Sequence, residues 1–299
     1  MERNLIDDLA EAVRQHLLAQ MPADPSGELS AMPLGSLLIK WFNWQDRYIP
    51  AVPRRVHDSN ELLGNSAAVT HAAALGLIRS AIAAGEDLTH RLSNRAGTAY
   101  IPMASGAPLH RRHDLDLLLA DWGIHHLHLS PADDGGRTPE LLFAVFRPGD
   151  AYLLQILTHE SWTDVSLLEV IVRNWPDAGL LAGSISGLAL AEPITPEDRK
   201  RFRRGGVATP VEVDGKLYLP RGQSTAGTAL DHATRANMLM ATLGEWRRHL
   251  DSHEAYPDLW AKENGRIASG QGRWRPFIDA RKFGLRDEIT ADRIEIGEF

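Results

Sequence analysis

The chain has 299 residues, of which 43% are hydrophobic and 24% are charged, and these values are typical of a globular protein with a buried core. Its formal net charge of −7 argues against a globally basic nucleic-acid-binding protein, so contact with nucleic acid would need a local basic patch. The absence of cysteine excludes disulfides, thiolate nucleophiles and cysteine-based zinc sites.

The beginning of the chain does not resemble a targeting segment, because acidic residues interrupt its apolar pattern. No window reaches the ~18 consecutive apolar residues of a membrane span. We therefore expect a cytoplasmic protein without membrane association.

The first ninety residues favour helices. Leu5, Leu9, Val13 and Leu17 recur at a spacing of four, which predicts an amphipathic helix over residues 4–21. The alanine-rich segment 66–84 predicts a second helix that Gly85 ends.

Basic residues follow an aromatic-rich stretch at residues 36–52. Arg47, Arg54, Arg55 and His57 lie close behind these aromatic side chains. Two interpretations stay open: a groove that binds a phosphate backbone, or a loop fixed to the core by its aromatic residues.

The middle of the chain predicts three consecutive antiparallel strands at residues 124–129, 141–147 and 151–159. Pro148-Gly149-Asp150 predicts a tight hairpin between the last two. A short helix over 114–122, which Asp114 would cap, precedes the strands, and a helix from Thr163 follows them. The strands are almost entirely apolar, so we expect both faces of the sheet to be covered.

The last third predicts a hairpin over 209–220 around Asp214-Gly215, a long helix over 228–250 and a weak strand at 293–296. Residues 193–204, which contain a run of arginines, are interpreted as a linker-like region. Together these elements predict an α+β protein with a central antiparallel sheet flanked by helices. We expect three regions: helical 1–95, a sheet domain 96–192, and a C-terminal α+β region 193–299.

The first predicted strand carries a cluster of histidines. Side chains alternate between the two faces of a strand, so His126 and His128 share one face while His125 points to the other. His159, at the end of the third strand, joins them only if the register allows.

These histidines fit two kinds of chemistry. Neutral imidazole is a good ligand for divalent ions, so His126, His128 and the upstream Asp116 are candidates for a metal site. Alternatively, histidines act as general acid and base on a phosphodiester without a metal, because their pKa lies near neutrality and RNA carries its own nucleophile, the 2′-hydroxyl. Arg137 and Arg147 are then the candidates for stabilising the phosphorane charge. Candidates for contacting the RNA backbone are Arg111, Arg112, Arg199, Arg201 and Arg203.

The strand pattern over residues 111–175 resembles the RelE/ParE-like toxins. LLFAVF is similar to a strand of that family, and AYLLQILTHESW is similar to its final strand, with His159 and Trp162 where members often have a histidine and an aromatic residue. The resemblance implies a small twisted antiparallel sheet, metal-independent cleavage of mRNA, and an antitoxin partner. The chain departs from the family in its greater length and its net acidity.

The sequence thus predicts a metal-independent endoribonuclease of RelE-like type, a toxin or defence effector, with His126, His128 and His159 as acid–base groups and no cofactor. The alternatives are a metal-dependent hydrolase or nuclease built on His126 and His128, which would need a divalent metal, and a non-enzymatic protein-interaction module. The oligomeric state is not predicted.

Overall fold

The computed structural model describes residues 4–21, 27–93, 96, 116–130, 138–158, 165–192, 194–204, 207–223, 228–252, 256–266 and 273–299. Its contacts divide the chain into two compact units. Unit 1 comprises residues 1–42 and 232–299, and unit 2 comprises residues 43–231. This division differs from the three consecutive regions expected from sequence, because the two ends of the chain pack together while residues 43–93 join the unit of the central sheet.

Unit 1 is an α+β unit whose three-stranded antiparallel sheet has the order β10-β9-β8. The elements that lie wholly or mostly in it are α1 (Leu5–Gln20), α2 (Glu28–Ala31), α3 (Leu34–Gln45), α10 (Leu230–Ser252), α11 (Tyr256–Glu263), β8 (Trp274–Asp279), β9 (Lys282–Asp287) and β10 (Arg293–Glu298). The predicted strand at 293–296 is confirmed within β10.

Helix α1 forms where its periodicity predicted. Asn4 caps it, because the side-chain oxygen accepts from the backbone N–H of Ile6 at 3.2 Å. The buried stripe consists of Ile6, Leu9, Val13 and Leu17, so Ile6 takes the place predicted for Leu5. This stripe packs against β8 and β9.

Unit 2 contains a four-stranded sheet of order β1-β4-β3-β2. Its elements are β1 (Arg55–Asp58), α4 (Asn60–Leu63), α5 (Ser66–Thr70), α6 (Ala72–Ala84), the 3₁₀ turn η1 (Thr89–Arg91), α7 (Leu117–Trp122), β2 (Ile124–His128), β3 (Glu140–Phe146), β4 (Asp150–Thr158), α8 (Ser166–Asn174), β5 (Ser184–Ser186), α9 (Pro196–Arg204), β6 (Val211–Val213) and β7 (Lys216–Tyr218). The α+β class and the three antiparallel strands β2, β3 and β4 are confirmed.

Several local expectations for unit 2 are corrected. Strand β1 was not predicted, and it pairs in parallel with β4, so the sheet is mixed. The helix expected over 66–84 is broken at His71 into α5 and α6. Asp116 caps α7, and its side chain accepts from the backbone N–H groups of Leu118 and Leu119 at 3.1 Å. Asp114, the predicted cap, lies outside the described residues. The linker-like region contains helix α9.

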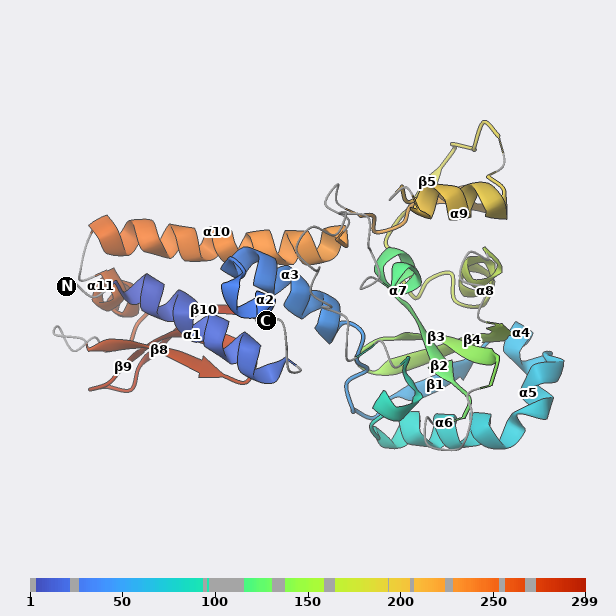
Figure 1. The fold of residues 1–299 in the computed structure, drawn as a ribbon, viewed down its shortest axis with the longest axis horizontal. Helices are drawn as coiled ribbons and strands as arrows, with labels where there is room; N and C mark the ends of the chain where they lie inside the picture. The colour runs from blue at the N-terminus through green and yellow to red at the C-terminus, as the bar shows by residue number, and fades with distance from the viewer. Residues whose placement is uncertain are drawn as a thin grey trace. The chain divides into compact units, whose positions relative to one another are not determined.

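Both faces of the four-stranded sheet are covered, as its apolar strands predicted. Figure 1 shows α6 along one face and α7 and α8 on the other. Leu127, Leu142 and Leu153 face the core on the α6 side, whereas Ile124, Phe143 and Val145 face the core on the α8 side. The described helices include none with the length and apolarity that crossing a membrane requires.

Candidate functional site

Polar side chains gather where β1 runs beside the start of β4. The parallel register places Arg55 beside Asp150 and His57 beside Tyr152. Neighbouring residues in adjacent strands point to the same face of a sheet, and so do residues two apart in one strand. The side chains of Arg55, His57, Asp150 and Tyr152 therefore share one face of the sheet.

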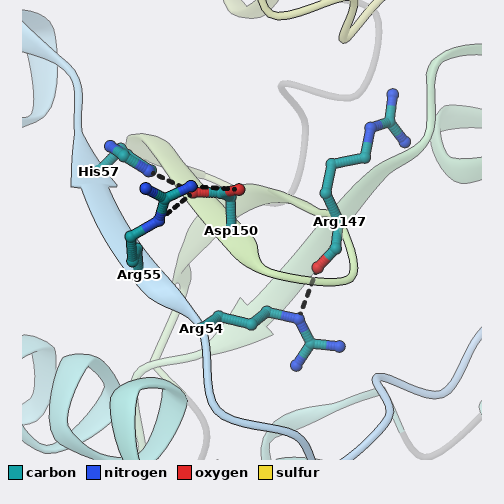
Figure 2. Close-up of polar contacts among 5 residues, drawn as sticks. All are labelled: Arg54, Arg55, His57, Arg147 and Asp150. Carbon is teal, nitrogen blue, oxygen red and sulfur yellow. Dashed lines mark hydrogen bonds and ion pairs between the residues drawn. The ribbon is translucent and has the colours of Figure 1, made fainter.

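Asp150 holds both basic residues of β1. His57 Nε2 lies 2.8 Å from Asp150 Oδ1. Arg55 donates from Nη2 to Oδ2 at 3.2 Å, and its Nε lies 3.0 Å from Oδ1. Figure 2 shows both side chains of β1 reaching the same carboxylate. The hydrogen bond from His57, and secondly that from Arg55, keep the pKa of Asp150 below its usual range, so this carboxylate is ionised at neutral pH.

The imidazole of His57 is fixed in orientation and still open to solvent. Its ring stacks on Tyr152 with the centroids 4.9 Å apart and 16° between the planes. Tyr152 in turn meets the edge of Trp175 at the end of α8. The His57 side chain is 36% exposed, and its Nδ1 has no hydrogen-bond partner among the described residues. Nδ1 is thus the ring nitrogen available to a substrate.

The loop before β1 is held by a buried arginine. Arg54 is 7% exposed and donates to the carbonyl oxygens of Pro50, Val52 and Arg147. Burial lowers the pKa of this guanidinium. Because all these acceptors are backbone atoms, Arg54 joins the entry of β1 to the β3–β4 hairpin, as Figure 2 shows for the bond to Arg147. Its role here is to position the strand that carries His57.

Arg147, predicted as a catalytic cation, lies on the same hairpin. Its Nη2 donates to the carbonyl oxygens of Leu180 at 3.0 Å and Gly179 at 3.4 Å. Burial first, and the nearby charge of Arg221 second, lower the pKa of Arg147. Its guanidinium is therefore directed to the segment after α8.

The predicted histidines lie at the opposite edge of the sheet, on β2. His126 and His128 pair with Phe143 and Leu141, so they share the α8 face as the alternation predicted. His128 is 2% exposed. His126 Nδ1 lies 3.5 Å from Asp116 Oδ2, and both side chains are 22% exposed. Within the described part of the chain, the ligand atoms of His126, His128 and Asp116 do not converge within 4.8 Å as a metal site would require.

A small pocket of about 30 Å³ opens beside this edge of the sheet. Its lining residues are Arg47, Leu92, Ser93, Ala96, Asp116, Leu119, His125 and His126. Burial lowers the pKa of His125 to about 4, so this imidazole is neutral at pH 7. The pocket is the second place in unit 2 where titratable groups meet.

The two histidine sites are too far apart to act on one phosphodiester. The register runs from His57 through Tyr152 and Val145 to Ile124, which is three strand spacings. With ~4.8 Å between strands and ~7 Å from Ile124 to His126, the Cα atoms of His57 and His126 are ~16 Å apart. Each histidine therefore belongs to a site of its own.

The remaining predicted residues are distributed as follows. His159, Arg137, Arg111 and Arg112 lie outside the described residues. Arg199 is 5% exposed and donates to Thr209 Oγ1 at 2.6 Å, so its interpretation as an RNA contact is corrected to a structural bond. Arg201 is exposed and paired with Asp198, and nothing is described of the side chain of Arg203.

Sequence reasoning noticed His57 but did not connect it with Asp150. Ninety-three residues separate the two, and only the parallel pairing of β1 with β4 brings them together. The available signals were the basic residues behind the aromatic stretch and the aspartate at the hairpin. Neither signal predicts that His57 and Asp150 are in contact.

No family model, curated protein or solved structure matches this chain. The resemblance to RelE/ParE-like toxins therefore stays a prediction.

Proposed function

We propose that unit 2 is a metal-independent ribonuclease in which His57, oriented by Asp150, is the general base. The observation that supports this most is the 2.8 Å contact between a part-exposed imidazole and an ionised carboxylate. Because the carboxylate accepts from Nε2–H, the neutral ring keeps its lone pair on Nδ1. The same carboxylate stabilises the imidazolium that forms when Nδ1 takes a proton.

RNA suits such a site because its 2′-hydroxyl is the nucleophile. Nδ1 of His57 removes the 2′-hydroxyl proton, the 2′-oxygen attacks the adjacent phosphorus, and the bond to the 5′-oxygen breaks. A water molecule gives the leaving 5′-oxygen its proton, and the products are a 2′,3′-cyclic phosphate and a free 5′-hydroxyl. Arg55, whose side chain is 80% exposed, is the cation proposed to face the phosphoryl oxygens.

This proposal keeps the reaction predicted from sequence and moves its centre from His126 to His57. Two features favour His57: its carboxylate contact is 2.8 Å rather than the 3.5 Å of His126 with Asp116, and an exposed arginine shares the carboxylate. RNA is the proposed partner, and an antitoxin partner stays a prediction. A cytoplasmic location is part of the same proposal.

The reaction class is tested by incubating purified protein with a labelled RNA in excess chelator. We expect cleavage that leaves 2′,3′-cyclic phosphate ends and stops when the RNA is fully 2′-O-methylated. His57→Gln is expected to lower the rate at least 100-fold, the usual range for loss of a general base. His71→Gln is the matched control, because His71 also lies beside a carboxylate, 3.7 Å from Glu140. Cleavage that needs an added metal ion, or that survives His57→Gln, would contradict the proposal.

A further inference from the structure

Two arginines from distant parts of the sequence lie near each other at the hairpin end of the unit 2 sheet. Arg221 follows β7, and its backbone N–H donates to the carbonyl oxygen of Asp121 at 2.9 Å. Its guanidinium lies against Gly123, where an added Cβ would be 2.8 Å from Nη2 and 3.2 Å from Cζ. Because glycine has no Cβ, it permits this close approach. The two contacts hold Arg221 at the start of β2.

The second arginine is Arg147, at the end of β3. Ile124, which follows Gly123, pairs with Val145, and Arg147 lies two residues beyond Val145. Residues two apart in an extended strand point to the same face, so Arg147 shares the α8 face with Val145. Its Nη2 donates to backbone carbonyl oxygens in the segment after α8. Its Nε and Nη1 have no hydrogen-bond partner among the described residues, so they are available to a ligand. We call Arg147 and Arg221 the arginine pair.

The two guanidinium groups are close enough to repel each other. Burial is the first cause that lowers the pKa of Arg147, and the charge of Arg221 is the second, while Tyr152 acts in the opposite direction. Among the described groups that act on this pKa there is no carboxylate. Holding two like charges together in a partly buried place costs free energy, and an anion bound between them would offset that cost.

The carboxylates around the arginine pair do not neutralise it. Those described on α7, β4, α8 and the turn after α8 are Asp121, Asp150, Glu169 and Asp177. Asp150 is held by the basic residues of β1, and Glu169 lies 3.2 Å from Arg173. Asp121 is 1% exposed and meets Arg221 through its backbone carbonyl. Within the part of the chain that the structure describes, neither arginine of the pair forms an ion pair with any of these side chains.

The arginine pair lies beside the proposed catalytic histidine. Tyr152 stacks on His57, and it pairs with Val145 on β3. Arg147 is therefore two strand spacings and two residues away from His57, which places their Cα atoms ~12 Å apart. Figure 2 shows the Arg147 guanidinium standing apart from the side chains that surround Asp150. An anion held by the arginine pair would thus lie next to the reacting bond without occupying its place.

We propose that Arg147 and Arg221 form a phosphate-binding subsite beside the catalytic centre. Guanidinium groups stay charged at neutral pH, and their planar fork matches the oxygens of a phosphate group. We assign the phosphate to RNA, outside the cleaved bond, and this assignment rests on the function proposed for unit 2. Neither arginine transfers a proton, and their role is to hold the strand.

The first measurement uses inorganic phosphate as the probe and unfolding in urea as the readout. An anion that binds the folded protein raises the urea midpoint. Phosphate also stabilises proteins in general because it is excluded from their surface, so the shift relative to chloride at equal ionic strength is compared between variants. We expect a larger shift for the unaltered protein than for Arg221→Gln. Arg173→Gln is the matched control, because Arg173 is 53% exposed and already paired with Glu169, and it should show the full shift. Equal shifts in all three proteins would overturn the subsite.

The second measurement is fluorescence anisotropy with a labelled 2′-O-methyl RNA, which binds but cannot be cleaved. Arg221→Gln is expected to lower the slope of log affinity against log salt by ~0.7, the loss of one phosphate contact. Over one decade of salt concentration this slope corresponds to a loss of about fivefold in affinity. Arg221→Lys keeps the charge and is expected to keep the slope, whereas Arg173→Gln should change the affinity less than about twofold.

The two measurements distinguish the sources of the phosphate. An Arg221-dependent midpoint shift together with Arg221-independent RNA binding would assign the subsite to a small phosphate compound and overturn RNA as its ligand. A slope that Arg221→Lys fails to restore would give Arg221 a structural role and overturn the phosphate contact.

Failure of the two proposals is distinguishable. His57→Gln is expected to show the same phosphate shift and to bind the 2′-O-methyl RNA as tightly as the unaltered protein. Cleavage without an Arg221-dependent phosphate shift would overturn only the subsite. Arg221-dependent binding without cleavage would overturn only the catalytic proposal.

Discussion

The serine that follows β1 offers a sharp test of how the His57 strand is held. Ser59 is fully buried, and its Oγ accepts from the N–H of Leu62 at 2.9 Å, which caps α4. The same hydroxyl donates to the carbonyl oxygen of Leu154 at 2.5 Å, which joins the end of β1 to β4. Ser59→Ala removes both bonds and leaves the backbone unchanged.

The expected cost follows from these two bonds. Loss of a helix N-cap costs about 1 kcal/mol. Loss of a buried hydrogen bond, which leaves the Leu154 carbonyl without its side-chain donor, costs about 1 kcal/mol more. Ser59→Ala should therefore lower the free energy of unfolding by about 2 kcal/mol.

The assay is equilibrium unfolding in urea followed by circular dichroism. Ser80→Ala is the matched control, because Ser80 is exposed within α6 and alanine is the better helix former. The control is expected to leave stability equal or slightly higher. A loss below about 0.5 kcal/mol for Ser59→Ala, or one no larger than that of the control, would refute the reasoning.

Four further variants, one of them a control, test other parts of unit 2 in the same urea assay. His125→Phe tests the lowered pKa of His125, which is about 4 in the folded protein against 6.5 in the unfolded chain. Because the unfolded chain binds more protons between these two pH values, stability is lost as the pH falls, by up to about 2 kcal/mol at pH 5. The variant should lack this loss. Gly85→Ala should lower the free energy of unfolding by about 2 to 4 kcal/mol, because φ at Gly85 is +74° and an added Cβ would lie 2.5 Å from the backbone nitrogen of Pro53. A smaller loss would show that the backbone at Pro53 shifts to make room for the methyl group. Arg199→Ala should lower the free energy of unfolding by about 2 kcal/mol without changing the affinity for RNA. Arg201→Ala, the control, should change the free energy of unfolding by less than about 0.5 kcal/mol. Equal losses for the two variants would contradict the buried structural role of Arg199.

The sheet of unit 2 shows which features the sequence could predict. Strands β2, β3 and β4 are consecutive and apolar, and Pro148-Gly149-Asp150 marks the hairpin, so local signals were sufficient. Strict alternation also placed His126 and His128 on one face. These are short-range properties of the chain.

The site could not be predicted because it depends on a long-range pairing. Strand β1 has four residues, RVHD, of which only Val56 is apolar, so it has no periodicity to detect. Its partner strand begins ninety-five residues after Arg55, at Asp150. A parallel register between such distant segments is determined by packing of the whole unit. For the same reason the sequence did not predict that Arg199 makes a buried structural bond, because its acceptor Thr209 lies beyond the end of α9.

The most direct test of the central claim compares the two histidine sites in one experiment. Initial rates of RNA cleavage in chelator are measured for His57→Gln and His126→Gln against the unaltered protein. A loss of at least 100-fold for His57→Gln, with a change below about threefold for His126→Gln, is the predicted result. A loss confined to His126→Gln would place the chemistry at the β2 edge and contradict the assignment of His57 as the general base.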